Sequence, residues 1–99
     1  MIQYSTIEEI IENSKPHAIK SGRQNVFRVG DYYFSVVGGG WGLYGDFENT
    51  FEVAILDRRH RICTKRLFPD RDDEVFPWQT REQLIELMDT VNKMSKKGS

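Results

Sequence analysis

The sequence is poor in cysteine and has no long hydrophobic segment. Its only cysteine, Cys63, cannot form an intramolecular disulfide, which excludes a disulfide-stapled miniprotein and favours a reducing compartment. No apolar run approaches the ~20 residues that a membrane-spanning helix needs. Residues 1–10 carry acidic side chains where a secretory signal would carry basic ones. We therefore expect a cytoplasmic protein that does not enter a membrane.

The chain also lacks an excess of charge of either sign. Fourteen Lys and Arg residues against fifteen Asp and Glu residues give a net charge of -1, so no overall field attracts nucleic acid or anionic lipid. A hydrophobic content of 38% excludes a disordered or collagen-like chain. Its 99 residues suffice for one modest core and not for two. We assign residues 1–95 to a single domain and residues 96–99 to a flexible tail.

Helix signals stand near both ends of the domain. The spacing of Thr6 and Glu9 matches a capping box, and the isoleucines that follow share one helical face, which predicts a helix over roughly residues 6–14. A second capping box, Thr80 to Gln83, precedes an apolar stripe at helical spacing. The stripe consists of Leu84, Leu87, Met88, Val91 and Met94.

Between these helices, four segments have the composition of β-strands. They cover residues 25–29, 32–37, 50–57 and 61–68, and Gly30-Asp31 joins the first two as a short hairpin. The fourth segment carries polar groups on both faces, so we expect it at the sheet edge, ended by Pro69. The predicted fold is α+β: a four-stranded antiparallel meander flanked by an N-terminal and a C-terminal helix (α-β-β-β-β-α), with both helices on one face.

A glycine-rich segment separates the second and third strands. Residues 40–45 match G-x-G-x-x-G, but a strand follows and no Gly-Lys-Ser/Thr is present, which excludes a dinucleotide fold and a P-loop. The loop either folds tightly, with Trp41 or Phe47 against the core, or displays aromatic residues to a partner. The candidate partner-binding residues are Trp41, Leu43 and Tyr44. Backbone amides could instead form an anion-binding nest from Gly38, Gly39, Gly40 and Gly42.

The densest basic segment follows the third strand. It comprises Arg58, Arg59, Arg61, Lys65 and Arg66. These cations could neutralise phosphates, with Tyr32 and Tyr33 as stacking platforms. The acidic segment 70–74 nearly cancels their charge, so we favour a solvated hairpin end and keep a nucleic-acid interface as the alternative.

No set of residues assembles into a catalytic or metal centre. The only histidines are His17 and His60, which together with Cys63 are too few for a zinc site. The acidic segment 70–74 lacks the glycine and glutamate of a calcium-binding EF-hand. We therefore predict a non-enzymatic protein with no catalytic residues, no metal and no cofactor.

Residues 35–57 resemble part of a known group of sequences. The stretch SVVGGGWGLYGD followed by NTFEVAILD is similar to small uncharacterised accessory proteins of tailed bacteriophages, whose pattern pairs GGG-x-GLYGD with NTFEVA. The resemblance extends over roughly residues 34–90, with the acidic connector and the terminal helix included. It implies a phage accessory protein that binds a host protein in the bacterial cytoplasm and modulates or inhibits it.

The predicted meander leaves one sheet face without helices. The second strand carries apolar or aromatic side chains on both faces, since Tyr32, Phe34 and Val36 alternate with Tyr33, Ser35 and Val37. A domain of this size has few elements to cover both faces. We therefore predict a homodimer through the open face, or a hetero-complex. In the alternative, long polar side chains and residues 15–24 cover that face in a monomer.

Overall fold

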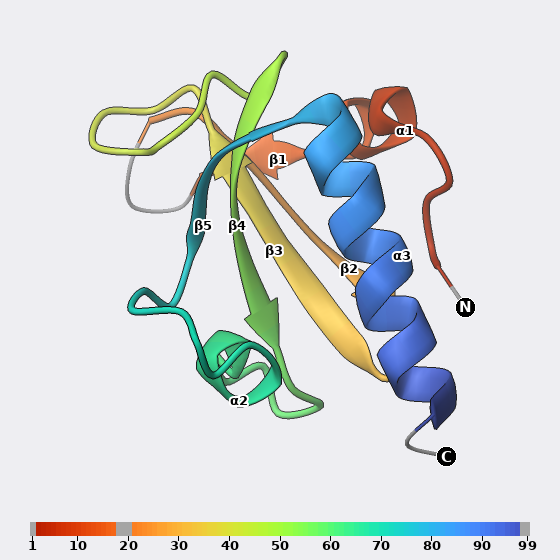
Figure 1. The fold of residues 1–99 in the computed structure, drawn as a ribbon. Coiled ribbons are helices and arrows are strands. Elements are labelled where there is room, and N and C mark those ends of the chain that lie inside the picture. The colour runs from red at the N-terminus through yellow and green to blue at the C-terminus, as the bar shows by residue number, and fades with distance from the viewer. Residues whose placement is uncertain (1, 18–20, 98–99) are drawn as a thin grey trace.

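The structure is a computed structural model that describes residues 2–17 and 21–97. Within these residues, five strands form one antiparallel sheet in the order β1-β2-β3-β4-β5, so each strand pairs with its neighbours in sequence (Figure 1). This confirms the α+β class and the meander. The elements are α1 (Ile7–Glu12), β1 (Lys15–Pro16), β2 (Arg23–Val29), β3 (Tyr32–Gly38), β4 (Thr50–Leu56), α2 (Thr64–Leu67), β5 (Phe76–Thr80) and α3 (Arg81–Lys97).

The predicted count of four strands was wrong, because segment 61–68 does not form one. It makes a single bridge, Ile62 to Leu56, and then turns into α2. The Cys63 amide donates to the Ile55 carbonyl at 2.8 Å, and the Ile55 amide donates to the Thr64 hydroxyl at 3.0 Å. These bonds satisfy the end of β4 without a full strand. The edge of the sheet is instead β5, in a segment for which we predicted no strand, and β1 adds a short strand at the opposite edge.

Both predicted capping boxes are present. The Glu9 amide donates to the Thr6 hydroxyl at 3.2 Å, and that hydroxyl donates to the Glu9 carboxylate at 3.1 Å. Bonds from the hydroxyls of Ser5 and Thr6 lower the pKa of the Glu9 carboxyl. At the start of α3, the Gln83 amide donates to the Thr80 hydroxyl at 3.2 Å and the Thr80 amide to the Gln83 side chain at 2.9 Å. The caps therefore set where both helices begin.

The ends of the two helices differ from those expected. Helix α1 stops at Glu12, two residues before the predicted end, with Asn13 as its C-cap. Helix α3 continues to Lys97, which is two residues past the predicted domain end, and residues 98–99 lie outside the described residues. No helix in the described part of the chain is long and apolar enough to cross a membrane.

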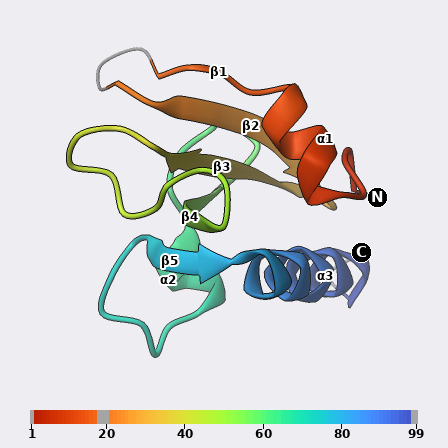
Figure 2. The same cartoon turned by 90° about the horizontal axis from the view of Figure 1, so that it is seen from above.

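The core lies between one face of the sheet and the helices α1 and α3. Inward-facing side chains of β2, β3 and β4 are fully buried there, together with those of Ile10 in α1 and of Leu84 and Val91 in α3. Figure 2 shows both helices on the same side of the strands. The expected placement of both helices on one face is therefore confirmed. The apolar stripe of α3 packs into the core, as its helical spacing predicted.

The other face of the sheet, called here the second sheet face, carries no helix from α1 or α3. Most of its side chains are partly exposed, including Val26 at 39%. The described part of segment 15–24 pairs with β2 as β1 and so extends the sheet instead of covering this face, while residues 18–20 lie outside the described residues. The second sheet face consists of Gln24, Val26, Arg28, Tyr33, Ser35, Val37, Glu52, Ala54 and Leu56.

Candidate protein-binding surface

The glycine-rich loop between β3 and β4 is folded on itself by backbone hydrogen bonds. The Gly39 amide donates to the Gly45 carbonyl at 2.8 Å and the Leu43 amide to the Gly40 carbonyl at 3.2 Å. The loop also lies directly on the preceding hairpin, because a Cβ atom on Gly40 would overlap the carbonyl oxygen of Ser21. Glycine is required at this position for that close approach. The loop is therefore tightly folded against the rest of the domain.

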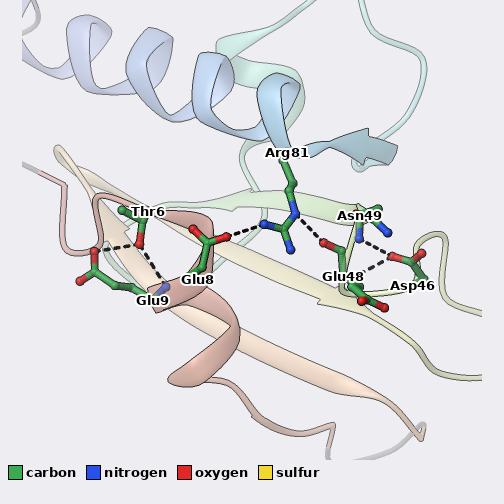
Figure 3. Close-up of polar contacts among 7 residues, drawn as sticks. All are labelled: Thr6, Glu8, Glu9, Asp46, Glu48, Asn49 and Arg81. Atoms are coloured by element: carbon green, nitrogen blue, oxygen red, sulfur yellow. Dashed lines mark hydrogen bonds and ion pairs between the residues drawn. The ribbon is translucent and has the colours of Figure 1, made fainter.

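Asp46 anchors the end of the loop to the start of β4. One oxygen of its carboxylate accepts backbone amides from Glu48, Asn49 and Thr50 at 2.8–2.9 Å. Figure 3 shows Asp46 with Glu48 and Asn49. These amides, that of Thr50 above all, hold the pKa of Asp46 at about 2, below the ordinary value of 3.8. They also support the turn in which Phe47, with φ of 59°, places its ring in the core against Phe51.

The aromatic side chains of the loop divide between the core and the solvent. Phe47 is buried, as one of the two interpretations of the loop required, whereas Trp41 is 87% exposed and Tyr44 is 49% exposed. Leu43, which lies between Trp41 and Tyr44 in the sequence, is half-buried. The loop thus folds tightly and displays aromatic residues at the same time, so the two interpretations apply to different side chains.

Trp78 of β5 extends this exposed surface. From the sequence we favoured Phe76 and Trp78 as cover for the sheet edge or the helix start, with a docking surface of aromatic residues around Pro77 as the alternative. Phe76 is buried, but Trp78 is 58% exposed. A register shift between β4 and β5 interrupts the alternation of side chains, and Trp78 adopts φ of 54°. Its ring lies 6.1 Å from that of Tyr44, and its amide donates to the Tyr44 carbonyl at 3.1 Å. We call Trp41, Tyr44 and Trp78 the aromatic surface.

The proposed anion nest has fewer available amides than the sequence suggested. Gly38 is the last residue of β3 and pairs with Arg23 of β2, and the Gly39 amide is bonded to Gly45. Of the four candidate glycines, Gly40 and Gly42 therefore remain to offer an amide to a ligand. Two amides alone make a weaker anion site than the full nest.

A cleft of about 590 Å³ lies beside the base of the loop. Its charged groups contact the protein itself: Arg23 donates to the hydroxyl and the carbonyl of Ser14 at 3.0 and 2.6 Å. Arg81 forms an ion pair with Glu8 and donates to the Glu48 carbonyl at 2.8 Å (Figure 3). These contacts join α1, the loop and the start of α3, so the arginines act as structural ties across the cleft.

The basic side chains lie at the C-terminal end of β4, whereas the glycine-rich loop lies at its N-terminal end. They belong to the turn after β4 and to α2. All five are exposed: Arg58, Arg59, Arg61, Lys65 and Arg66. The turn is closed by Asp57, whose carboxylate accepts the amides of Arg59 and Arg61 at 2.8 and 3.0 Å, which lowers its pKa. The rings of Tyr33 and His60 are in contact, with centroids 4.5 Å apart and planes inclined by 46°, whereas Tyr32 lies on the other face and packs against the core. The two tyrosines therefore form no common stacking platform.

Side chains that could bind a metal ion are not clustered in the part of the chain that the structure describes. Within residues 2–17 and 21–97, no three His, Cys, Asp or Glu side chains come together as metal ligands would. Cys63 is buried, and burial raises the pKa of its thiol. A thiol in that environment is a poor nucleophile.

Comparison of the chain with protein-family models, with curated protein sequences and with solved structures finds no match. The interpretation of the aromatic surface therefore depends on its own geometry. In that geometry the exposed rings of Tyr44 and Trp78 are in contact, on a loop and a strand that share a hydrogen bond, and Trp41 is a further exposed ring of the same loop. Surfaces of this kind are typical of protein–protein contact sites.

Proposed function

We propose that this protein is a non-enzymatic binding protein that contacts another protein through the aromatic surface. The observation that carries the proposal is Trp78, which is 58% exposed at a backbone φ of 54°. A left-handed conformation costs a non-glycine residue about 1 kcal/mol or more. The indole ring is more exposed than buried, so the folded chain gains only part of the free energy that full burial of the ring would supply. Strained and exposed aromatic residues of this kind cluster at functional sites.

The neighbouring aromatic residues support the same proposal. Trp41 is 87% exposed, and Tyr44 contacts Trp78. Tryptophan and tyrosine are enriched among the residues that dominate the energy of protein interfaces. The hydrogen bonds within the loop and from Trp78 to Tyr44 hold the surface in place before a partner arrives. Less conformational entropy is then lost on binding.

The resemblance to phage accessory proteins suggests where the partner is found. We propose that the partner is a host protein in the bacterial cytoplasm and that binding modulates or inhibits it. This role needs no catalytic group, cofactor or metal on the present chain. Leu43, half-buried beside the exposed rings, would supply apolar area at the edge of the contact.

Capture of partners from a bacterial lysate tests the proposal. The immobilised protein is compared with the Trp41→Ala/Tyr44→Ala and Trp78→Ala variants and with Ile85→Ala, which removes an exposed apolar side chain from α3. We expect the first two to weaken the dissociation constant of the captured protein at least ~30-fold, as loss of a dominant interface residue does. The Ile85→Ala control should bind as the wild type does. Equal binding by all four proteins would exclude the aromatic surface as the site.

The basic end of the molecule supports a second candidate, binding of nucleic acid. Five exposed cations lie within the turn after β4 and in α2, next to Tyr33 and His60, whose rings are in contact. Fluorescence anisotropy with single-stranded and duplex oligonucleotides tests this candidate. Affinity should fall with salt by a slope of about −0.7 to −0.9 per phosphate contacted, and Arg58→Ala/Arg59→Ala should reduce that slope. Binding weaker than ~10⁻⁴ M at low salt would remove the candidate.

A further inference from the structure

The two segments that carry the aromatic surface are acidic and contain no basic residue. They are residues 38–52, which span the glycine-rich loop and the start of β4, and residues 72–80, which lead into β5 and include it. Neither segment contains Lys, Arg or His. Their six acidic residues are Asp46, Glu48, Glu52, Asp72, Asp73 and Glu74. Negatively charged segments therefore carry the exposed rings, although the net charge of the whole chain is only -1.

The acidic residues of these segments are not neutralised by ion pairs. None of the six forms one within the described residues. Two arginines flank the second segment. Arg81 is paired with Glu8, and the guanidinium of Arg71 packs on a ring of β5. The five exposed cations of the basic turn and α2 lie at the other end of β4. Negative charge therefore outweighs positive charge on the segments that carry the aromatic surface.

The register shift between β4 and β5 brings one of these acidic residues to the aromatic rings. It leaves two residues of β5, Pro77 and Trp78, opposite the single residue Glu52 of β4. The Glu52 carboxylate also accepts the Tyr44 amide at 3.2 Å. A hydrogen bond from a neutral amide leaves the carboxylate its negative charge. Glu52 therefore adjoins both of the residues whose rings are in contact.

The rings of Tyr44 and Trp78 can offer their faces to a cation. Their centres are 6.1 Å apart and their planes are inclined by 50°, so neither ring covers the other as in a parallel stack. The two residues are 49% and 58% exposed. The face of an aromatic ring attracts Arg and Lys side chains, and that of tryptophan does so most strongly. The chain itself contains such a contact, because the Arg71 guanidinium lies 3.9 Å from the centre of the Phe76 ring.

We propose that the aromatic surface binds a positively charged segment of the partner protein, with an arginine side chain of that segment on the rings of Tyr44 and Trp78. The inference rests on the proposed function and adds the chemistry of the partner. The charge of Glu52 attracts the guanidinium, and the other five carboxylates favour further basic residues beside it. Arginine fits better than lysine, because its planar guanidinium stacks on rings and is more weakly hydrated. The same carboxylates repel an acidic segment.

Two matched peptides test the charge of the partner segment. One is a short synthetic peptide of alternating Arg and Ser, and the other has citrulline, the uncharged analogue of arginine, at every Arg position. The chain has two tryptophans and therefore two indole N–H signals in an NMR spectrum, which Trp41→Phe assigns. The arginine peptide should shift the Trp78 signal and bind at least ~5-fold more tightly than the citrulline peptide. Equal binding of the two peptides, or an unmoved Trp78 signal, would overturn the inference.

A substitution of Glu52 tests the contribution of the carboxylate. Glu52→Gln keeps an oxygen that can accept the Tyr44 amide, so only the charge is lost. It should weaken binding of the arginine peptide ~2–5-fold, and Trp78→Ala should weaken it at least as much. The matched control Glu86→Gln, exposed on α3, should bind as the wild type does. Unchanged binding by both Glu52→Gln and Trp78→Ala would place the peptide elsewhere on the chain and reject the site.

Capture of the partner from the lysate separates this inference from the proposed function. We expect Glu52→Gln to weaken capture, and capture by the wild type to fall as the salt concentration rises. If Trp78→Ala loses the partner while Glu52→Gln and added salt change nothing, the partner contact is apolar. The inference then fails and the proposed function stands. If every variant captures the partner as the wild type does, the proposed function itself fails, whatever the peptides show.

Discussion

Replacing Asp46 by alanine should destabilise the protein through the turn that anchors the glycine-rich loop. The Asp46 carboxylate accepts three backbone amides, from Glu48, Asn49 and Thr50. Alanine leaves these amides to water, which is the situation at a helix N-terminus that loses its cap. Such losses cost about 1 kcal/mol. For a domain of this size, 1 kcal/mol lowers the Tm by about 4–8 °C.

The effect of this substitution should depend on pH with a defined sign. The amides hold the pKa of Asp46 at about 2 in the folded protein, against 3.8 ordinarily. A carboxyl whose pKa is lowered by folding stabilises the folded state above its unfolded pKa and loses that effect as the pH falls through the folded one. The difference in Tm between wild type and Asp46→Ala should therefore be complete at neutral pH. It should shrink between pH 3.8 and about 2.

Thermal unfolding followed by circular dichroism measures both effects. Asp46→Asn is the matched control, because its amide oxygen keeps an acceptor while the charge is lost, so its Tm should lie between those of the other two proteins. Asp46→Ala with the Tm of the wild type would refute the anchoring role. A difference that persists unchanged down to pH about 2 would show that the bonds to the charged carboxylate are not its cause.

Three further outcomes follow from single contacts. Gly40→Ala should cost about 1–3 kcal/mol by overpacking, since its Cβ would overlap the Ser21 carbonyl, and an unchanged Tm would contradict the packing of the loop. Thr64→Val should cost about 1–3 kcal/mol in denaturant titration because the buried Ile55 amide loses its acceptor. Thr64→Ser should recover most of that loss. Cys63 should react with thiol reagents far more slowly in the folded than in the unfolded protein, since it is buried and its pKa is raised, and rapid native labelling would disprove this.

Features that depend on neighbouring residues were predictable from the sequence alone. The capping boxes at Thr6 and Thr80, the Gly30-Asp31 hairpin and the stripe of α3 involve residues within a few positions of one another. Local backbone geometry decides such features, so composition and spacing suffice to predict them. The exposure of Trp41 was not predicted in this way, because the sequence left open whether Trp41 or Phe47 lies against the core; the structure buries Phe47 and exposes Trp41.

Features that depend on competition between distant segments were not predictable in this way. Residues 61–68 and 76–80 both lie next to β4. The bond from the Cys63 amide to the Ile55 carbonyl and the bond from the Ile55 amide to the Thr64 hydroxyl decided that the first becomes a turn and a helix while the second becomes the edge strand. The register shift that turns Trp78 outward arises from that pairing. The sequence by itself therefore determined the two capped helices and the hairpin. Only the tertiary structure decided which strand closes the sheet and that Trp78 joins Tyr44, because strand pairing compares contacts across long stretches of chain.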